Sequence, residues 1–479
     1  MIQKTLEYFG KIASIPHPSY DTTLLFEFLS QECKKLGAQV SVDEVRNIHL
    51  LKGNPKCCLQ GHYDMVAVGQ AREKKPLELY EEAQGEKRFL RARDSSLGAD
   101  NGVAIALCLA LANKYDDIEC LFTNDEEVGM LGAKALQLPI HANIMLNLDS
   151  ENINEIVLGC AGGMDINAKK SLHPQKCKYA HFYTITAFGF QGGHSGIDIN
   201  KGRENAIIEC AKLLGELPCE IMRFKGGEKR NSIPTGVEVI IASEQDLLDS
   251  LALGKFCNYL ESFEKSPQSL CLKSAKKWGF VFRQCEWSEN LSFVKEQILP
   301  ILLEIKSGVY ESDGAVVLNS ANLSLCELEI SPTPTFSLSI MARANDDEKL
   351  THTKTRLRQS LQMQDFAVEI SDFYGAWKRS IHDDDTLLQL LVKEFNVCEI
   401  TPSVVQIHAG LECGILQKRI GELRAKSAGK SELLKILSIG PSIDFPHSTQ
   451  ERLDLASLKH FVTIVENFMQ SLQKDCKVS

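Results

Sequence analysis

The stretch that decides the fold is Thr123-Asn124-Asp125-Glu126-Glu127-Val128-Gly129. The preceding residues, 118–122, predict a short buried strand, and residues 130–136 predict a helix. Three carboxylates therefore stand where a strand ends and a helix begins, which is where open α/β sheets place their ligands. Without a cation these acids would repel one another. The stretch predicts a metal site with one acid left to carry a proton, and the alternative is a solvated acidic turn that caps the helix.

Length and charge narrow the classes of protein that the chain can represent. With 479 residues it exceeds what one hydrophobic core normally supports, so two domains are expected. The net charge is −10, and no run of Lys and Arg is long enough to bind a phosphate backbone, so nucleic acid is not an expected partner. The longest apolar segment, 103–112, is too short to span a bilayer, so a membrane is not expected either.

The sixteen cysteines are scattered and contain no CxxC pair. Several of them, such as Cys57, Cys108 and Cys120, lie in apolar strand or helix patterns, which is typical of reduced thiols that pack as small core residues. The first sixteen residues have helical spacing rather than the continuous apolar core of a signal peptide. These observations predict a cytoplasmic protein.

Other polar residues also follow predicted core elements. The buried strand 56–60 leads to His62 and Asp64, which point to the same side of an extended chain, so that the acid can fix the histidine tautomer. Asp100 lies between glycines at the start of an unusually apolar helix, where it either faces a ligand or only caps the helix. The strand 143–148 ends at Asp149.

The pattern of elements predicts a core domain that is split by an insertion. Residues 1–180 form its first part, 181–379 an inserted α+β domain with an antiparallel sheet, and 380–479 its second part. The glycine-rich segment 159–163 is interpreted as a flexible stretch and the segment 421–430 as a polar connector. A Pro- and Gly-rich loop near the end carries His447.

Five potential ligands collect at the edges of these elements, and they suit two zinc ions that share a carboxylate. They are His62, Asp100, Glu127, Asp149 and His447. Two divalent ions are balanced by the three carboxylates and one hydroxide, which gives the neutral cluster that a partly buried site requires. Glu126 is then left over as a base without a ligand role.

Nine motifs in the same order resemble those of the co-catalytic zinc peptidases related to carnosinase, and most closely the bacterial aminoacyl-histidine dipeptidases, also called cytosolic non-specific or Xaa-His dipeptidases. The motifs are GHYDMV (61–66), LGADNG (97–102), DEEVGMLGA (125–133), NLDSE (147–151), GCAGG (159–163), GGHSG (192–196), RNSIP (230–234), HAGLECG (408–414) and IGPSIDFPHS (439–448). The resemblance covers nearly the whole chain. It implies an α/β zinc-peptidase core with a mixed, largely parallel sheet flanked by helices, plus an inserted α+β lid and dimerisation domain.

The resemblance also implies roles for individual residues. His62 and Asp149 would hold one zinc ion, Glu127 and His447 the other, and Asp100 would bridge both, before a cis peptide bond to Asn101. Manganese or cobalt could replace zinc in such a site. Asp64 would orient His62, and Glu126 would take a proton from the bridging water and pass it to the leaving amine.

The inserted domain would supply further contacts to the substrate and would form a homodimer. His194 would stabilise the oxyanion, unless it is only a packed loop histidine. Asn231 and Arg343 would grip the substrate carboxylate, although Arg343 could pair with Asp346 or Asp347 instead. Next to Gly410, Glu412 would receive the free amine of the substrate or merely cap the following helix.

The sequence as a whole predicts a metal-dependent dipeptidase that acts on short peptides with a free N-terminus, of Xaa-His type or of broad specificity. Two alternatives remain at this stage: an amidohydrolase for N-acyl amino acids, and a catalytically dead relative that binds metal. Thr235 and the segment 449–452 depart from the family pattern, which leaves the preferred side chains open.

Overall fold

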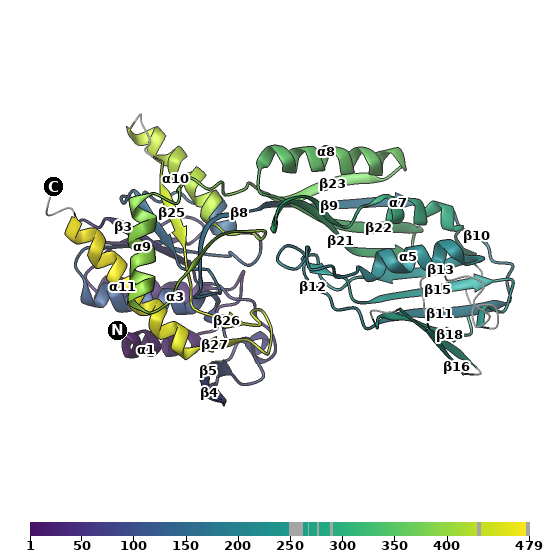
Figure 1. The fold of residues 1–479 in the computed structure, drawn as a ribbon, viewed down its shortest axis with the longest axis horizontal. Coiled ribbons are helices and arrows are strands. Elements are labelled where there is room, and N and C mark those ends of the chain that lie inside the picture. Colours follow the sequence, from purple (N-terminus) through teal and green to yellow (C-terminus); the bar gives the residue numbers. More distant parts are fainter. Residues whose placement is uncertain (249–261, 267, 275–276, 288–290, 429–432, 476–479) are drawn as a thin grey trace. The chain divides into compact units, whose positions relative to one another are not determined.

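A computed structural model describes residues 1–248, 262–266, 268–274, 277–287, 291–428 and 433–475 of the chain (Figure 1). The chain divides into two compact units. Unit 1 contains Met1–Cys160, Trp377–Gln406 and Leu411–Ser479, and unit 2 contains Ala161–Ala376 and Ile407–Gly410. The purple and yellow ends of the colour range lie together in unit 1, because both ends of the sequence build it (Figure 1).

Unit 1 is built on an eight-stranded mixed sheet. In sheet order its strands are β1 (Gln39–Val42), β2 (Ile48–Lys52), β6 (Ile118–Thr123), β3 (Cys57–His62), β7 (Ile144–Asn147), β25 (Lys435–Ser438), β8 (Glu155–Cys160) and β24 (Ser403–Ile407). The central strands β6, β3, β7 and β25 are parallel, whereas β1 with β2, β2 with β6, and β25 with β8 pair antiparallel. Parallel strands end at the same edge of a sheet, so the residues that follow β3, β6 and β7 are brought together.

Helices cover this sheet and enclose its core. They are α1 (Ile2–Ala13), α2 (Thr23–Lys35), α3 (Ala99–Lys114), α4 (Leu131–Ala135), α9 (Thr386–Val397), α10 (Cys413–Ala428) and α11 (Leu455–Asp475), with the 3-10 turn η1 (Gln70–Glu73). Helix α3 is buried along almost its whole length, as its apolar sequence predicts, and it contacts α1 and β3. A second, four-stranded sheet has the order β26 (Ile443–Asp444), β27 (Arg452–Asp454), β5 (Lys87–Ala92), β4 (Leu79–Gln84).

Unit 2 is an α+β domain with an eleven-stranded sheet in which the neighbouring strands of the described residues all pair antiparallel. In sheet order the strands are β16 (Ser262–Ser266), β17 (Ser269–Lys273), β18 (Gly279–Gln284), β11 (His181–Phe188), β15 (Val237–Ser243), β13 (Cys219–Gly226), β21 (Val316–Glu329), β22 (Thr335–Ala344), β9 (Gly162–Ser171) and β23 (Ala367–Tyr374), and β20 (Gly308–Asp313) pairs with β21. Two short ladders add β10 (Gln175–Lys176) with β19 (Leu291–Ser292), and β12 (Gly193–His194) with β14 (Ser232–Ile233).

Three helices of unit 2 are α5 (Ala206–Glu216), α7 (Leu299–Glu304) and α8 (Asp347–Met363) (Figure 1). One continuous apolar core joins them to the sheet. The 3-10 turn η2 (Lys295–Gln297) precedes α7. Side chains fix where the longer helices begin. Asn205 accepts hydrogen bonds from the first amides of α5, and Asp346 accepts those of α8. The expected α/β core with a mixed sheet and an inserted α+β domain is confirmed.

Candidate metal centre

Five acids and histidines of unit 1 meet at the edge where the parallel strands end. His62 is the last residue of β3, Glu127 follows β6 and Asp149 follows β7. Asp100 lies at the start of the buried helix α3, and His447 is in the loop after β26. Residues that are up to 385 positions apart in the sequence are therefore neighbours in space, because each follows a core element that ends at this edge. The peptide bond between Asp100 and Asn101 is cis, as expected.

Each histidine of this cluster faces two carboxylates with a single ring nitrogen. The Nε2 atom of His62 lies 3.1 Å from Asp100 Oδ1 and 3.3 Å from Asp149 Oδ1. The Nε2 atom of His447 lies 3.0 Å from Asp100 Oδ2 and 2.9 Å from Glu127 Oε1. The contacts therefore form two groups that share Asp100, and in each group the potential ligand atoms lie within 4.8 Å of one another. A third such group contains His62, Glu126 and Glu127.

The electrostatics of the cluster are those of acids crowded together without a counter-ion. Burial, together with the neighbouring Asp100, raises the pKa of Glu127 to about 7. Burial also raises the pKa of Asp149 to about 6, against the opposing effect of His62. For His447, burial lowers the pKa, but hydrogen bonds to Asp100 and Glu127 outweigh it and raise the pKa to about 12. The cluster binds protons where a metal ion would otherwise supply positive charge.

The residues fit a divalent metal ion. Glu127 Oε1 and Asp149 Oδ1 are buried and have no hydrogen-bond donor among the described residues, although the histidine nitrogens lie close to them. One N–H cannot satisfy two carboxylates at once, whereas a cation between them would contact all three groups. Imidazole nitrogen and carboxylate oxygen are the ligands that zinc, manganese and cobalt accept.

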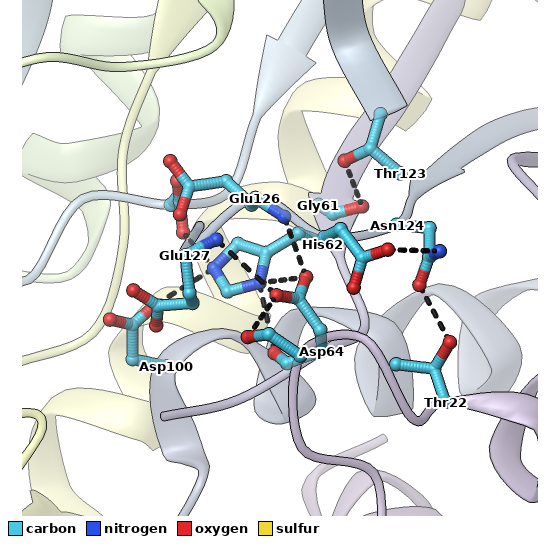
Figure 2. A network of polar contacts seen from close by, with 12 residues as sticks. Thr22, Gly61, His62, Asp64, Asp100, Thr123, Asn124, Glu126 and Glu127 are labelled. Carbon is cyan, nitrogen blue, oxygen red and sulfur yellow. Dashed lines mark hydrogen bonds and ion pairs between the residues drawn. The ribbon is translucent and has the colours of Figure 1, made fainter. Parts of the chain in front are cut away.

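Asp64 connects the histidine His62 to the turn that carries Glu126 and Glu127 (Figure 2). The carboxylate of Asp64 accepts hydrogen bonds from the backbone N–H groups of Glu126, at 2.9 Å, and Glu127, at 3.3 Å. It also accepts the hydroxyl of Ser19 at 2.8 Å. The Nδ1 atom of His62 lies 3.0 Å from the backbone carbonyl of Asp64 and 3.4 Å from its carboxylate, so the carbonyl is the nearer acceptor.

Glu126 is half-buried among like charges and forms no ion pair within the part of the chain that the structure describes. Burial raises its pKa well above the usual value, and Glu127 and Asp149 add to that shift while His62 opposes it. A carboxyl group with a raised pKa, held beside potential metal ligands, is suited to accept and return a proton.

Glu412 is fully buried below the same edge of the sheet. Its Oε2 atom accepts hydrogen bonds from the side chains of Gln60, at 2.7 Å, and Thr123, at 2.6 Å. The other oxygen, Oε1, has no donor among the described residues. Burial raises the pKa of Glu412 to about 7. This carboxyl group therefore has one fixed oxygen and one that is open to a further donor.

His194 and Asn231 are adjacent in unit 2, since the ladder of β12 and β14 pairs His194 with Ser232. The Nδ1 atom of His194 accepts hydrogen bonds from the backbone N–H groups of Gly196 and Ile197, at 3.2 and 3.1 Å. In a neutral ring the proton is then on Nε2, so this nitrogen is a hydrogen-bond donor.

Arg343 is only 4% exposed, at the end of β22. Its Nη1 donates to the hydroxyl of Tyr374 at 2.8 Å, and its Nε has no acceptor among the described residues. A Cβ atom on Gly410 would lie 2.9 Å from the Tyr374 ring, so only glycine leaves this space. Burial and the charge of Arg343 lower the pKa of nearby His408 to about 3, which keeps that histidine neutral. A buried guanidinium with an open donor is a site for an anion.

The two acids that offered an alternative partner for Arg343 both accept backbone N–H groups. Asp346 caps α8 through Glu348 and Lys349, and Asp347 accepts the N–H of Ala376.

Comparison with known proteins gives similarity over nearly the full length. The chain is 29% identical to the cytosol non-specific dipeptidase of Escherichia coli, with 98% of each chain covered. Aminoacylhistidine dipeptidase from Vibrio alginolyticus has 26% identity and a TM-score of 0.72 over 98% of this chain and 96% of that one. The chain is therefore similar to these two dipeptidases over nearly its whole length. The resemblance stated from the motifs is thereby confirmed.

A more distant solved structure shares the fold alone. The di-peptidase Dug1p from Saccharomyces cerevisiae has a TM-score of 0.51 at 13% identity, over 98% of this chain and 96% of that one. No protein-family model matches the chain. Among the described residues, none of the helices is long and apolar enough to cross a membrane.

Several residues that support the peptidase site were missed by sequence reasoning. Ser19 holds Asp64, Gln60 holds Glu412, and Tyr374 contacts Arg343. Their partners are 31 to 352 residues away in the sequence, and local patterns carry no information on such pairs. Gln60 alone gave a signal, because a glutamine in an otherwise apolar strand next to His62 needs a buried partner.

Proposed function

We propose that the chain is a metal-dependent dipeptidase that hydrolyses short peptides with a free N-terminus, of Xaa-His type or of broad specificity. One observation carries the proposal: two imidazole–carboxylate groups share Asp100, and the half-buried acid Glu126 lies beside them. The names of the two relatives, a non-specific dipeptidase and an aminoacylhistidine dipeptidase, support the substrate class.

The proposed metal content is two zinc ions, with manganese or cobalt as possible replacements. His62 and Asp149 would hold the first ion, Glu127 and His447 the second, and Asp100 both. When bound, such ions act as Lewis acids for the scissile carbonyl and make water more acidic. The third group, with Glu126 as a ligand, is less suitable, since it leaves no free base.

Glu126 is the proposed general base and acid. It would remove a proton from the attacking water and return that proton to the nitrogen of the leaving amine. The hydrogen bond from the backbone N–H of Glu126 to the carboxylate of Asp64 fixes the backbone position of Glu126. Asp64 also contacts His62, so one residue holds both the proposed base and a proposed metal ligand. His194, whose Nδ1 accepts backbone N–H groups so that a neutral ring carries its proton on Nε2, is the proposed donor to the oxyanion.

Substrate recognition is proposed to use the two ends of the dipeptide. The open donor of Arg343 would bind the terminal carboxylate, together with Asn231. Glu412, two residues after Gly410 in the sequence, would accept the free amine with its open Oε1 atom. A homodimer through the inserted domain and a cytoplasmic location complete the proposal, and the name of the Escherichia coli relative supports the latter.

Purified protein, loaded with zinc, should hydrolyse Xaa-His dipeptides and leave acetylated amino acids intact. The Glu126→Ala variant should keep its metal content while hydrolysis falls by a factor of about 10² or more, since only the proton carrier is removed. Preferential hydrolysis of acetylated amino acids would instead identify an amidohydrolase. Wild-type activity in the variant would exclude Glu126 as the base. Light scattering of the wild-type sample tests separately whether the protein is a dimer.

A further inference from the structure

Helix α3 carries Asp100 in its first turn, yet Asp100 does not cap the helix. The residue at the cap position is Gly98, and it has no side chain with which to accept the amides that open the helix. An aspartate in the first turn would normally be a strong candidate for such a cap. The carboxylate of Asp100 instead faces His62 and His447. Some other group must satisfy the amides at the start of α3.

That group is Glu451, from the loop that follows His447. Its Oε2 accepts the backbone N–H of Leu97 and its Oε1 accepts that of Ala99, both at 2.9 Å. Glu451 is only 2% exposed. Among the described residues, no Lys or Arg forms an ion pair with it. A carboxylate buried in this way is held by the backbone amides and by the positive end of the helix.

We infer that Glu451 is a positioning residue for the metal centre, because it holds the backbone immediately before Asp100, where the chain enters α3, and so leaves the Asp100 carboxylate free to bridge two ions. The amides that Glu451 accepts belong to the residue immediately before Asp100 and to the third residue before it. Glu451 is also only four residues after His447. It therefore fixes the distance between Asp100 and His447, whose facing atoms lie 3.0 Å apart.

A purely structural cap would stabilise the helix without affecting the metal, and a matched control separates the two roles. Glu119 is equally buried in unit 1 and accepts the backbone N–H groups of His141 and Ala142 at 2.8 and 2.9 Å. It lies near the start of β6, at the end of the strand away from the cluster. Glu119→Gln removes the same kind of hydrogen bonds at a distance from the ligands.

The inference rests on the proposed metal site and not on the substrate, so the experiment measures metal binding. Metal-free wild-type protein and the Glu451→Gln, Glu451→Ala and Glu119→Gln variants are titrated with Zn²⁺ and with Co²⁺ in competition with a chelator, and their urea unfolding is recorded. Loss of a residue that orients a ligand weakens metal affinity by about 10- to 100-fold. We expect this loss in both Glu451 variants, whereas Glu119→Gln should lower the unfolding midpoint and leave metal affinity unchanged.

A double-mutant cycle tests whether Glu451 acts through Asp100. Because the bridging oxygen is already altered in Asp100→Asn, adding Glu451→Gln should weaken metal binding little further. Wild-type affinity in the Glu451 variants, or a fully additive loss in the double variant, would overturn the inference. If Glu451→Ala does not fold, Glu451→Gln decides, because it is nearly isosteric and keeps one acceptor oxygen. A wild-type protein that binds neither ion would refute the metal site itself.

Discussion

Replacement of Asp64 tests whether one carboxylate holds the catalytic turn. This side chain is 1% exposed and accepts hydrogen bonds from Ser19, Glu126 and Glu127. In Asp64→Asn the remaining oxygen can still accept the N–H of Glu126, and the Ser19 hydroxyl can turn to accept from the new amide. The N–H of Glu127 then has no acceptor, and an unsatisfied buried donor costs about 1–3 kcal/mol of the free energy of unfolding.

Asp64→Ala removes the acceptor of all three donors, so its loss of stability should be at least about 3 kcal/mol, taking about 1 kcal/mol for each donor. The effect on metal binding should be smaller than the effect on catalysis. The acceptor nearest to His62 Nδ1 is the backbone carbonyl of residue 64, which both variants keep. The turn with Glu126, in contrast, loses its support, and a displaced catalytic group lowers kcat by about 10- to 100-fold.

The assay compares urea unfolding, bound metal and kcat for a dipeptide in wild type, both Asp64 variants and Glu119→Gln. The control is closely matched, since Glu119 is also buried, lies 2.7 Å from a histidine and accepts two backbone N–H groups. The Glu119→Gln variant should lose stability and keep the kcat of the wild type. Loss of metal from Asp64→Asn with unchanged kcat per bound ion would show that the carboxylate serves His62 and not the turn.

Two further predictions concern the protonation of the cluster and the anion site of unit 2. The pKa values of Glu127 and Asp149 are raised to about 7 and about 6, and that of His447 to about 12, so the metal-free folded protein binds more protons than the unfolded chain. The free energy of unfolding of the metal-free protein should therefore fall as the pH rises from about 5 to 8. Metal uptake should release protons, and calorimetry in two buffers measures this release. A free energy of unfolding that rises over this pH range would contradict the assignment. Arg343→Ala should lower kcat/KM for free dipeptides by about 10- to 100-fold, which is the contribution of a hydrogen bond to a charged group. For dipeptide amides, which have no terminal carboxylate, kcat/KM should fall much less. Equal losses on both substrates would exclude a carboxylate site.

The strand-end residues of the metal cluster could be predicted from the sequence because the apolar strand that precedes each of them is a local sequence pattern. Apolar runs of strand length directly precede His62, Glu127 and Asp149, and parallel strands place such ends together. His447 is different, since it follows a loop rich in Pro and Gly with no strong periodicity. It was grouped with the others only as a potential ligand at the edge of a predicted element, and the resemblance to known peptidases then implied its role beside Glu127.

The prediction of a polar connector at residues 421–430 was wrong for residues 421–428, because α10 continues through Gly421 to Ala428. Residues 429 and 430 lie outside the described residues. The helix has only a weak apolar stripe, so its sequence gave no helical signal. It is held instead by arginines: Arg419 donates to the carbonyl of Leu136, and Arg424 to the carbonyls of Ile140 and Ala142. Contacts with residues so distant in sequence cannot be predicted from local periodicity.

The glycine-rich segment 159–163 was also interpreted incorrectly, since residues on both sides of Ala161 belong to β8 and β9. Its glycines serve close packing rather than flexibility. A Cβ atom on Gly162 would lie 2.6 Å from the backbone nitrogen of Ala376, and one on Gly163 would lie 2.4 Å from the Tyr374 hydroxyl. Glycine in a strand often marks such close approach, but the sequence does not identify the approaching group.

The acids that support the centre share one property that explains how the site can be both rigid and ready for metal. Asp64, Glu412 and Glu451 are buried, and the donors that fix them are neutral hydroxyl, amide and backbone N–H groups. A Lys or Arg in the same positions would add positive charge next to the ligands and would compete with a divalent ion by Coulomb repulsion. Hydroxyl, amide and backbone donors fix the geometry and leave Asp100, Glu127 and Asp149 with only the imidazoles of His62 and His447 as partners. The crowding of these carboxylates makes the metal-free cluster take up protons, so metal affinity and the pH dependence of stability have one physical origin.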